Sequence, residues 1–327
     1  MSMLVYPTGL LAGDVGELLQ KIQDRFLHDT QDKPYLSEAW EWPDDVAGEL
    51  RARTLFFEQA FNHLTYVQKD VLIQQMIQQA DNLLASEVSQ ISPSHRCYKT
   101  VIAAKVRGWA NKKENEYLAK ELKVPPCTVN SYSTGLALAA MYGSSRILFQ
   151  QGYQSKALDY FQFAEGVFTF WLQGTRGFYR KYFAPGEKHT ANRESLRLVT
   201  NTNALMGLGH IAALDGCLAL APQNDCTTNH RSMIIALGKT IRAEFNSEEG
   251  VPVPGVSWPK SWNYGRNLGT GKREDVEDTP HASFTLEFVV ALSDETWVKS
   301  RLYQAPFFSR EQLDAFANVF LSNLVFA

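Results

Sequence analysis

Residues 153–173 read YQSKALDYFQFAEGVFTFWLQ, and the spacing of their apolar side chains decides the fold class. The apolar positions recur every three or four residues, at Ala157, Tyr160, Phe161, Ala164, Val167, Phe168 and Trp171. Because an α-helix completes a turn in about 3.6 residues, this spacing places them on one helical face. The stretch therefore predicts an amphipathic helix packed against a core.

Helical spacing recurs along most of the chain. In 51–90 the apolar positions step mostly by three or four, as one face of a helix requires: Phe56, Ala60, Leu64, Val67, Val71, Ile77, Leu84 and Val88. Further helices are predicted at about 14–29, 130–150, 200–221, 229–246, 280–293 and 310–325, with weaker signals at 96–108 and 114–122. The nearest approach to a strand, VPVPGV at 251–256, is interrupted by prolines. The sequence therefore predicts an all-α fold.

Local signals indicate where helices begin and how they connect. Ser309 stands three residues before Gln312, which is the pattern of a capping box. Thr279 followed by Pro280 is typical of an N-cap and a first-turn proline. Residues 153–155 after Gly152 predict a short turn between two helices, as an antiparallel hairpin needs.

Two runs suggest how the hairpins pack. YSTGLALAAM at 132–141 and NALMGLGH at 203–210 each open a helix with a polar group and continue with small residues. Small residues let helices approach closely, as in concentric helical rings. We therefore expect an (α/α)5–6 toroid, with about five or six hairpins whose inner helices surround a central cleft. It forms a single domain over 1–327, with an N-terminal helical extension over about 1–50. An irregular α-bundle remains the alternative.

Composition narrows the class of protein. The hydrophobic fraction is 45%, the charged fraction is 20% and the net charge is −3, so a globular core is expected and nucleic acid or an anionic membrane is not. The longest apolar stretch, 204–214, is interrupted by His210, and the N-terminus lacks the basic start of a signal peptide. These features predict a cytoplasmic protein without a membrane partner. The four scattered cysteines are expected to be mostly buried, reduced thiols, with disulfides as the less favoured alternative.

Two long irregular segments are expected, at about 174–190 and 247–278. The second contains Trp258, Trp262 and Tyr264 among basic residues, whereas disordered linkers contain few aromatic residues. We therefore expect 255–275 to be an ordered loop that brings these aromatic side chains to the rim of the cleft.

The sequence EDTPHA at 277–282 carries the main catalytic hypothesis. If Thr279 caps the helix, His281 lies in the first turn, where the helix dipole disfavours the imidazolium and lowers the pKa. A neutral imidazole suits a general base, and Asp278 or Glu277 is placed to orient the ring. Tyr264 and Arg266 are candidates to protonate or polarise a substrate. The alternative is a structural histidine that bonds a backbone carbonyl.

A second pair of candidates lies on the 200–221 helix. Asn203 and His210 are seven residues apart, so they share one helical face, and both are candidate substrate-binding residues. The alternatives are that Asn203, or its neighbour Asn201, caps the helix and that His210 is a hydrogen-bonded core histidine.

The motif WNY at 262–264, followed by EDTPHA at 277–282, resembles a motif near the C-terminal end of (α/α) toroid proteins related to polysaccharide lyases and uronate epimerases. The run that begins at Tyr132, the helix ending near Trp171 and the run 201–207 resemble the same family's order of elements. The similarity covers roughly 95–293 of the chain.

The resemblance implies acid–base chemistry in a ring-shaped cleft. Such lyases and epimerases abstract a proton next to a carboxylate, with Tyr or His as acid or base and Asn, Arg or His stabilising the enolate-like intermediate. On this resemblance we expect a lyase, isomerase or epimerase for a sugar-like or polyoxygenated small substrate. Trp258, Trp262, Arg266, Asn203, His210 and Tyr132 are then its binding residues.

Two other functions stay open. A cyclase or dehydratase-isomerase for a terpenoid-like intermediate would resemble linalool dehydratase-isomerase and would line its cleft with Phe, Leu and Met. A non-catalytic binding scaffold would expose an apolar patch. Glu277, Asp278 and His281 have metal-ligand chemistry, but no second histidine stands at helical spacing, so no metal is expected. Ser-His-Asp catalysis is not expected, because no nucleophile elbow is present. Phosphate-loop and dinucleotide signatures are also missing, and no cofactor is expected.

Overall fold

The computed structural model describes Lys21, Asp24 and the ranges 43–94, 98–99, 106–110, 129–175, 182–183, 197–220, 226–245, 265–267 and 279–314. Helices dominate these residues, which confirms the all-α class. Their bounds are α2 Pro43–Ala60, the 3-10 helix η2 Phe61–His63, α3 Tyr66–Ser86, α6 Ser131–Gln150, α7 Gln154–Thr175, α8 Thr200–Leu220, α9 Cys226–Phe245, α10 Thr279–Ala291 and α11 Glu295–Leu302.

The predicted helical stretch 51–90 is divided between α2 and α3. The break ends at Thr65, whose hydroxyl accepts a hydrogen bond from the Gln68 amide at 3.3 Å, while the Gln68 side chain accepts one from the Thr65 amide at 2.9 Å. This capping box starts a new helix by satisfying backbone donors at its first turn. The apolar spacing did not reveal the break, because both helices bury a face against the same core.

Other helix ends agree with the sequence only in part. The Ser309–Gln312 capping box is confirmed, with reciprocal hydrogen bonds of 2.9 and 3.3 Å. The weak helical signal at 96–108 is wrong at its end, because 106–110 is not helical. Helix α11 was not predicted, although Asp294 caps it by accepting a hydrogen bond from the Trp297 amide at 3.0 Å.

Four short strands interrupt the helical chain. β1 (Val129–Asn130) pairs with β2 (Tyr182–Phe183), and β3 (Arg197–Val199) pairs with β4 (Gly265–Asn267), both in antiparallel register. β1 runs directly into α6, and β3 runs directly into α8. Each small sheet therefore ties a distant segment to the start of a central helix.

Six of the described helices form three hairpins, α2–α3, α6–α7 and α8–α9, and α10 is followed by the short α11, which packs against α9. In the first hairpin, Arg53 bonds Gln75 while Glu49, one turn earlier, bonds Gln79, one turn later, so the two helices are antiparallel. The connection between α6 and α7 is only three residues long, as predicted for an antiparallel pair.

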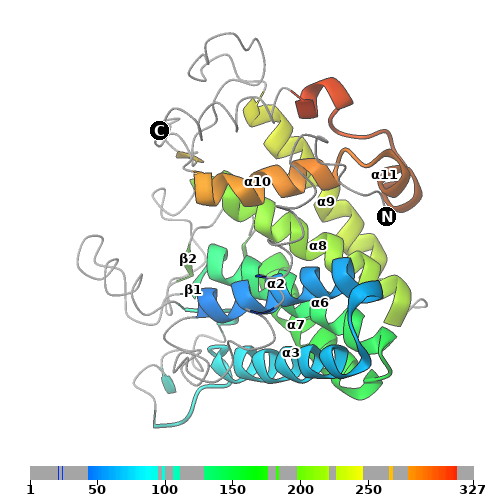
Figure 1. Ribbon diagram of the computed structural model, residues 1–327. Helices are drawn as coiled ribbons and strands as arrows, with labels where there is room; N and C mark the ends of the chain where they lie inside the picture. Colours follow the sequence, from blue (N-terminus) through cyan, green and yellow to red (C-terminus); the bar gives the residue numbers. More distant parts are fainter. Residues whose placement is uncertain are drawn as a thin grey trace.

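The first helices of these hairpins, α2, α6 and α8, run parallel to one another and to α10. Gly135 of α6 lies against Leu205 and Met206 of α8, and Gly209 of α8 lies against Ala139 of α6, so contacts advance together along both helices. A Cβ at Gly135 would come within 3.2 Å of the Met206 amide nitrogen, which explains the small residues of both runs. Figure 1 shows α2 in blue, α6 and α8 in green and α10 in orange crossing the molecule in similar directions.

Contacts of α2 and α10 follow the same order. Thr54 of α2 lies against Gly143 of α6, and Glu58, one turn later, pairs with Arg146. On α10, Phe284 packs on Tyr132 at the start of α6, and Phe288, one turn later, packs on Gly207 in α8. The N-terminal ends of α2, α6, α8 and α10 therefore lie at the same end of the bundle.

Helix α8 is the central helix of this arrangement. It packs against α6, α9 and α10, and its segment Asn203–Leu220 is long and apolar enough to cross a membrane by length and composition alone. Of this segment, 67% is buried inside the protein. The apolar character of α8 therefore goes with its burial against neighbouring helices.

Cys217 on α8 corrects the expectation of reduced thiols. Its side chain is fully buried and takes part in a disulfide. The other sulfur belongs to a residue whose side chain lies outside the described part of the chain.

Candidate functional site

Three of the four parallel helices are almost without charge. Helices α6, α8 and α10 each contain a single Asp, Glu, Lys or Arg residue, namely Arg146, Asp215 and Glu287. In an apolar core helix a charged side chain is retained only where it finds partners or water. The partners of these three residues therefore show where charge is accommodated between the helices.

All three meet charged residues of another helix. Arg146 forms an ion pair with Glu58 of α2, and Glu287 forms one with Arg51 of α2. Asp215 accepts hydrogen bonds on both carboxylate oxygens, from Arg301 Nε of α11 at 3.2 Å and from the Trp297 indole at 3.4 Å.

The Glu58–Arg146 pair and Asp215 interact electrostatically, and the Arg51–Glu287 pair lies two helical turns earlier on α2. Burial raises the pKa of the Glu58 carboxyl, the Arg146 guanidinium opposes this shift, and the carboxylate of Asp215 adds to it. Carboxyl groups from α2 and α8 therefore lie within electrostatic reach of each other. We call the set of Arg51, Glu58, Arg146, Asp215, Glu287 and Arg301 the central charged cluster.

Solvent reaches the central charged cluster. Glu58 and Arg51 are the most enclosed members, with side chains 13% and 14% exposed, and Arg301 is the most open at 42%. Ions that are partly hydrated and partly paired escape most of the desolvation cost of a dry interior. The cluster thus combines binding groups with access to water, which a ligand site requires.

An aromatic group borders the cluster toward the N-terminal ends of the helices. Phe284 of α10 contacts Tyr132 of α6 edge to face, with ring centroids 6.2 Å apart. The Arg51 guanidinium carbon lies 5.8 Å from the centroid of Phe284. Tyr132, predicted to bind substrate, is therefore placed beside the cluster.

The main catalytic candidate lies one turn from this aromatic group along the backbone. His281 is in the first turn of α10, three residues before Phe284, as the sequence predicted; its side chain lies outside the described residues. Arg266 is on β4 and pairs in register with Leu198, two residues before α8 begins. Both backbones are thus at the end where the parallel helices start. Trp258, Trp262, Tyr264, Glu277 and Asp278 lie outside the described residues.

Asn203 and His210 occupy one face of α8, as predicted. Asn203 is 1% exposed, and within the described residues neither its amide nitrogen nor its oxygen has a hydrogen-bond partner. His210 is 2% exposed and packs on Phe168 of α7 with ring centroids 4.5 Å apart. His210 thus faces the second helices of the hairpins rather than the central charged cluster.

His210 ends a buried polar chain between the helices. Its Nδ1 lies 3.0 Å from Nδ1 of His230, His230 Nε2 lies 2.8 Å from the Glu165 carboxylate, and the same oxygen accepts the Tyr142 hydroxyl at 2.7 Å. Burial lowers the pKa of His210 well below its ordinary value, and His230 lowers it further. Burial and the Glu165 carboxylate raise the pKa of Tyr142. Tyr142 and His210 are therefore neutral, and the hydrogen-bonded chain joins α6, α7, α8 and α9 in the core. This is the structural role that the alternative reading of His210 predicted.

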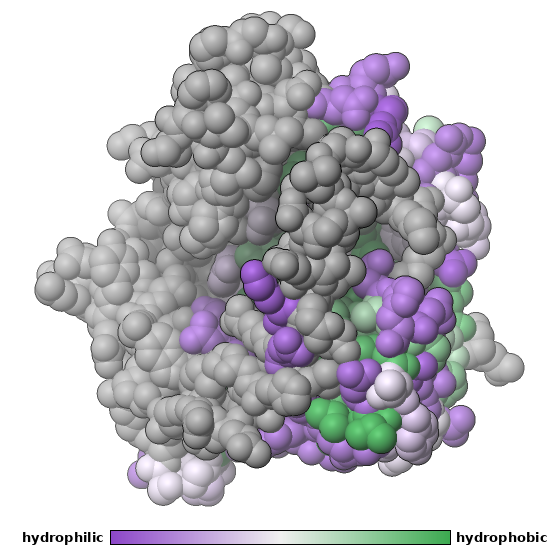
Figure 2. All heavy atoms as spheres, in the orientation of Figure 1, coloured by the Kyte–Doolittle hydropathy of each residue, from purple (hydrophilic) through white to green (hydrophobic). Residues whose placement is uncertain are grey.

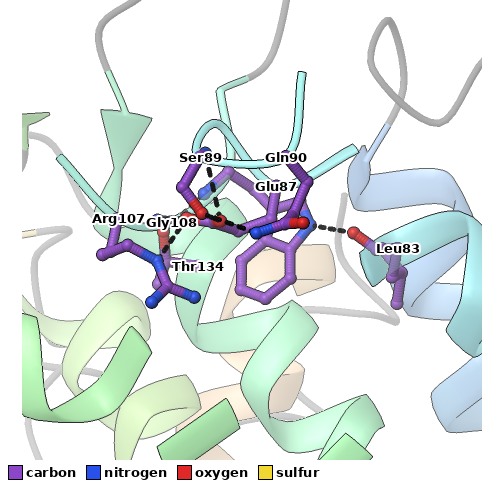
Figure 3. Close-up of polar contacts among 8 residues, drawn as sticks. Leu83, Glu87, Ser89, Gln90, Arg107, Gly108 and Thr134 are labelled. Carbon is purple, nitrogen blue, oxygen red and sulfur yellow. Dashed lines mark hydrogen bonds and ion pairs between the residues drawn. The ribbon is translucent and has the colours of Figure 1, made fainter. Parts of the chain in front are cut away.

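A separate polar group fixes the segment 106–110 near the start of α6. The carboxylate of Glu87 is fully buried and accepts hydrogen bonds from Arg107 Nε at 3.1 Å, the Gly108 amide at 2.6 Å and the Ser89 amide at 3.1 Å. Figure 3 shows these donors around Glu87. The next residue, Trp109, donates its amide to Thr134 and its indole N–H to the carbonyl oxygen of Leu83. Every charge here has its partners, so the group is structural.

Sequence reasoning missed the central charged cluster, although a signal was present. The signal is a single charged residue in an otherwise uncharged helix, which occurs at Arg146, Asp215 and Glu287. Within the described residues no group of three or more His, Cys, Asp or Glu side chains is arranged to hold a metal ion.

Comparison with protein-family models, with curated proteins and with solved structures finds no match to this chain. The relationship to toroid lyases and epimerases therefore stays a proposal, based on the motifs at 262–264 and 277–282.

Proposed function

We propose that this chain is an enzyme that uses general acid–base chemistry, of lyase, isomerase or epimerase type. Its substrate is a sugar-like or polyoxygenated small molecule, bound in a central cleft between α2, α6, α8 and α10. We further propose that these helices belong to an (α/α) toroid, as the motifs at 262–264 and 277–282 suggest.

The central charged cluster is the observation that carries the proposal. A helical bundle built only for stability fills its centre with apolar side chains, because each buried ion costs desolvation free energy. Here the only charged residue of α6 pairs with Glu58 of α2, that of α8 acts electrostatically on the same Glu58, and that of α10 pairs with Arg51, two turns earlier on α2. Retained, partly hydrated charges that converge from four helices favour a binding function over a purely structural one.

The cluster also weighs against the two rival functions. A terpenoid-like substrate needs an apolar wall, whereas guanidinium and carboxylate groups bind hydroxyl and carboxylate oxygens. A scaffold that binds a protein partner needs an extended apolar surface. On the described part of the face in Figure 2, hydrophobic residues form small areas bordered by hydrophilic ones.

In this proposal His281 is the general base, and Asp278 or Glu277 orients its ring. Tyr264 and Arg266 protonate or polarise the substrate, while Trp258 and Trp262 stack on its sugar face. Tyr132 and Asn203 contribute from the first turns of α6 and α8, at the same end of the bundle. His210 has no part in the chemistry, because it bonds His230 on the side away from the cluster.

The cytoplasmic location predicted from the sequence stays a prediction. The disulfide at Cys217 favours an oxidising compartment instead, because cytosolic thiols are kept reduced.

Proton abstraction next to a carboxylate is the step shared by these reaction types, so it gives the test. The purified chain is incubated in D2O with D-galacturonate, D-glucuronate and their 4-linked dimers, and NMR follows deuterium incorporation at C5, elimination and epimerisation. We expect the wild-type chain to catalyse exchange on at least one of them. His281→Ala should lower the rate about 10²-fold or more, the usual scale of general acid–base catalysis.

An exposed histidine gives the matched control. His63→Ala should leave both the exchange rate and the melting temperature unchanged, because His63 is exposed in η2. His281→Ala should also keep its melting temperature, since a cleft-lining side chain contributes little packing. The proposal fails if no uronate exchanges, or if His281→Ala loses stability by about 1–3 kcal/mol, as a structural histidine would, while its activity follows the folded fraction.

A further inference from the structure

The disulfide at Cys217 lies at one end of the hairpin that α8 forms with α9. The Cys217 side chain is fully buried, one turn before α8 ends at Leu220. The chain contains three other cysteines, Cys97, Cys127 and Cys226, and the last of these begins α9. The register of the helices distinguishes the three possible partners.

Cys217 and Cys226 are on the faces of α8 and α9 that meet. Cys217 is seven residues after His210, so the two residues share a face of α8. His210 Nδ1 lies 3.0 Å from Nδ1 of His230 on α9. Cys226 is four residues before His230 and shares the corresponding face of α9. Each cysteine therefore lies on the side of its helix that contacts the other helix.

The contact between His210 and His230 also sets the distance between the two cysteine positions. Because α9 returns antiparallel to α8, Cys217 and Cys226 both lie beyond this contact in the same direction, by seven and four residues. At the rise of an α-helix, the difference of three residues is about 4.5 Å along the axes. Cα atoms joined through a disulfide usually lie about 4.4–6.8 Å apart, so the register suits this pair.

Cys127 belongs to the opposite end of the bundle. Gly135 of α6 lies beside Leu205 of α8, and the two helices run in the same direction. Ser131, where α6 begins, is therefore about 24 Å from the level of Cys217 along the helix axes. The four residues from Ser131 back to Cys127 span at most about 14 Å. The remaining distance of about 10 Å is more than a disulfide bridges.

Cys97 is on a segment whose two ends are held near the start of α6. The segment lies between Val88 and Gly108, and the Val88 amide donates a hydrogen bond to the Gly108 carbonyl oxygen at 3.0 Å. The following Trp109 donates its amide to Thr134 in the first turn of α6. Figure 3 shows Gly108 beside Thr134. Both ends of this segment are thus far from the C-terminal end of α8, which favours Cys226 as the partner of Cys217.

We propose that Cys217 and Cys226 form the disulfide and that this bond clamps the start of α9 to the end of α8. The bond forms by thiol–disulfide exchange with a disulfide oxidant, which gains the two electrons and two protons that the thiols lose. The clamp makes the conformation of this hairpin end depend on the redox state, a property that lies beyond the proposed catalytic function.

The first two turns of α9 connect α8 to α11. His230 contacts His210 of α8, and Arg231 donates its Nε–H to the carbonyl oxygen of Arg301 at 2.6 Å. The Arg301 side chain in turn donates a hydrogen bond to Asp215 of α8. The clamp therefore holds in place a turn of α9 that anchors α11 over the end of α8. Without the bond, this turn separates from α8 more often, and α11 loses one of its anchors.

Peptide mapping of the purified, unreduced chain tests the pairing. Free thiols are first alkylated; Asp-N protease then cuts before Asp215 and Asp225, and trypsin cuts after Arg231. The two cysteines thereby separate into peptides 215–224 and 225–231. Mass spectrometry should find these two peptides joined by a disulfide. Peptide 215–224 joined to 97–99 or to 124–146, or alkylated at Cys217, overturns the proposal.

Hydrogen exchange tests the clamp in Cys226→Ser. Amides in the first two turns of α9 and in α11 should exchange about 10-fold faster or more than in the wild type, because the hairpin end opens locally. Amides of α3, in another hairpin, should keep their rates. Unchanged rates in α9, or equal acceleration of α3 and α9, would show that the bond does not act locally.

Cys97→Ser is the matched control, since it also replaces one cysteine by serine. It should keep the joined peptides 215–224 and 225–231 and the wild-type exchange rates in α9. If Cys226→Ser does not fold, the bond supports the whole fold and the local clamp is wrong, while the peptide map of the wild-type chain still decides the pairing.

Discussion

At the scale of single residues, burial decides what His210 and Asp215 do on the same helix. Both are polar residues in the apolar run of α8, 7 and 12 residues after Asn203. His210 faces α7 and α9 and is neutral, whereas Asp215 accepts hydrogen bonds from Trp297 and Arg301 of α11. A helical period shows which residues share a face, but the neighbours of that face come from tertiary packing.

The neutral state of His210 predicts how stability depends on pH. Its pKa in the folded protein lies below the ordinary value of 6.5, so as pH falls below about 6.5 the unfolded chain binds a proton that the folded chain does not. The free energy of unfolding should therefore decrease as the pH is lowered through this window. His210→Gln, neutral at every pH, should reduce this dependence, which urea unfolding at a series of pH values measures. An unchanged dependence would contradict the account.

At the scale of elements, the sequence allowed α6, α7, α8, α9 and α10 to be predicted within a few residues of their observed bounds. Long helices can be predicted because the apolar residues within each of them are periodically spaced. The break at Thr65 and the short α11 were missed because caps, not apolar periods, define them. The central charged cluster was missed because the sequence does not show which neighbouring helix an isolated charged residue contacts.

Close approach of α8 and α10 gives the prediction at this scale. A Cβ at Gly207 would overlap the ring of Phe288, which is fully buried and has little room to move. Gly207→Ala should lower the free energy of unfolding by about 1–3 kcal/mol, as overpacking does. Gly48→Ala is the control: nothing lies within 4 Å of its Cβ position in α2, so helix propensity should keep or raise stability. Chemical unfolding compares the two variants; equal stabilities would refute the tight contact.

At the scale of the whole molecule, α2, α6, α8 and α10 run parallel to one another, and β3 pairs with β4 at the end where those helices start. The all-α class was predictable from spacing, and the presence of hairpins from short turns. The number of hairpins and the closure of a ring involve segments outside the described residues, and they stay predictions.

The disulfide at Cys217 makes a prediction for the molecule as a whole. Because it cross-links a fully buried position on the central helix, reduction should lower the free energy of unfolding by about 2–4 kcal/mol. Thiol titration of the unfolded, unreduced protein should find fewer than the four thiols that the sequence contains. Four titratable thiols in folded, active protein would contradict the disulfide and restore the cytoplasmic expectation.

The central claim is that a polyoxygenated, acidic substrate lies among α2, α6, α8 and α10, and a structure determined with the 4-linked D-galacturonate dimer bound tests it most directly. The account predicts that the dimer lies among these four helices, with one sugar unit near Tyr132 and Phe284 and its C5 proton within reach of His281. A dimer bound outside the four helices, or a centre in which the charged side chains pack against one another and leave it no room, would contradict the account.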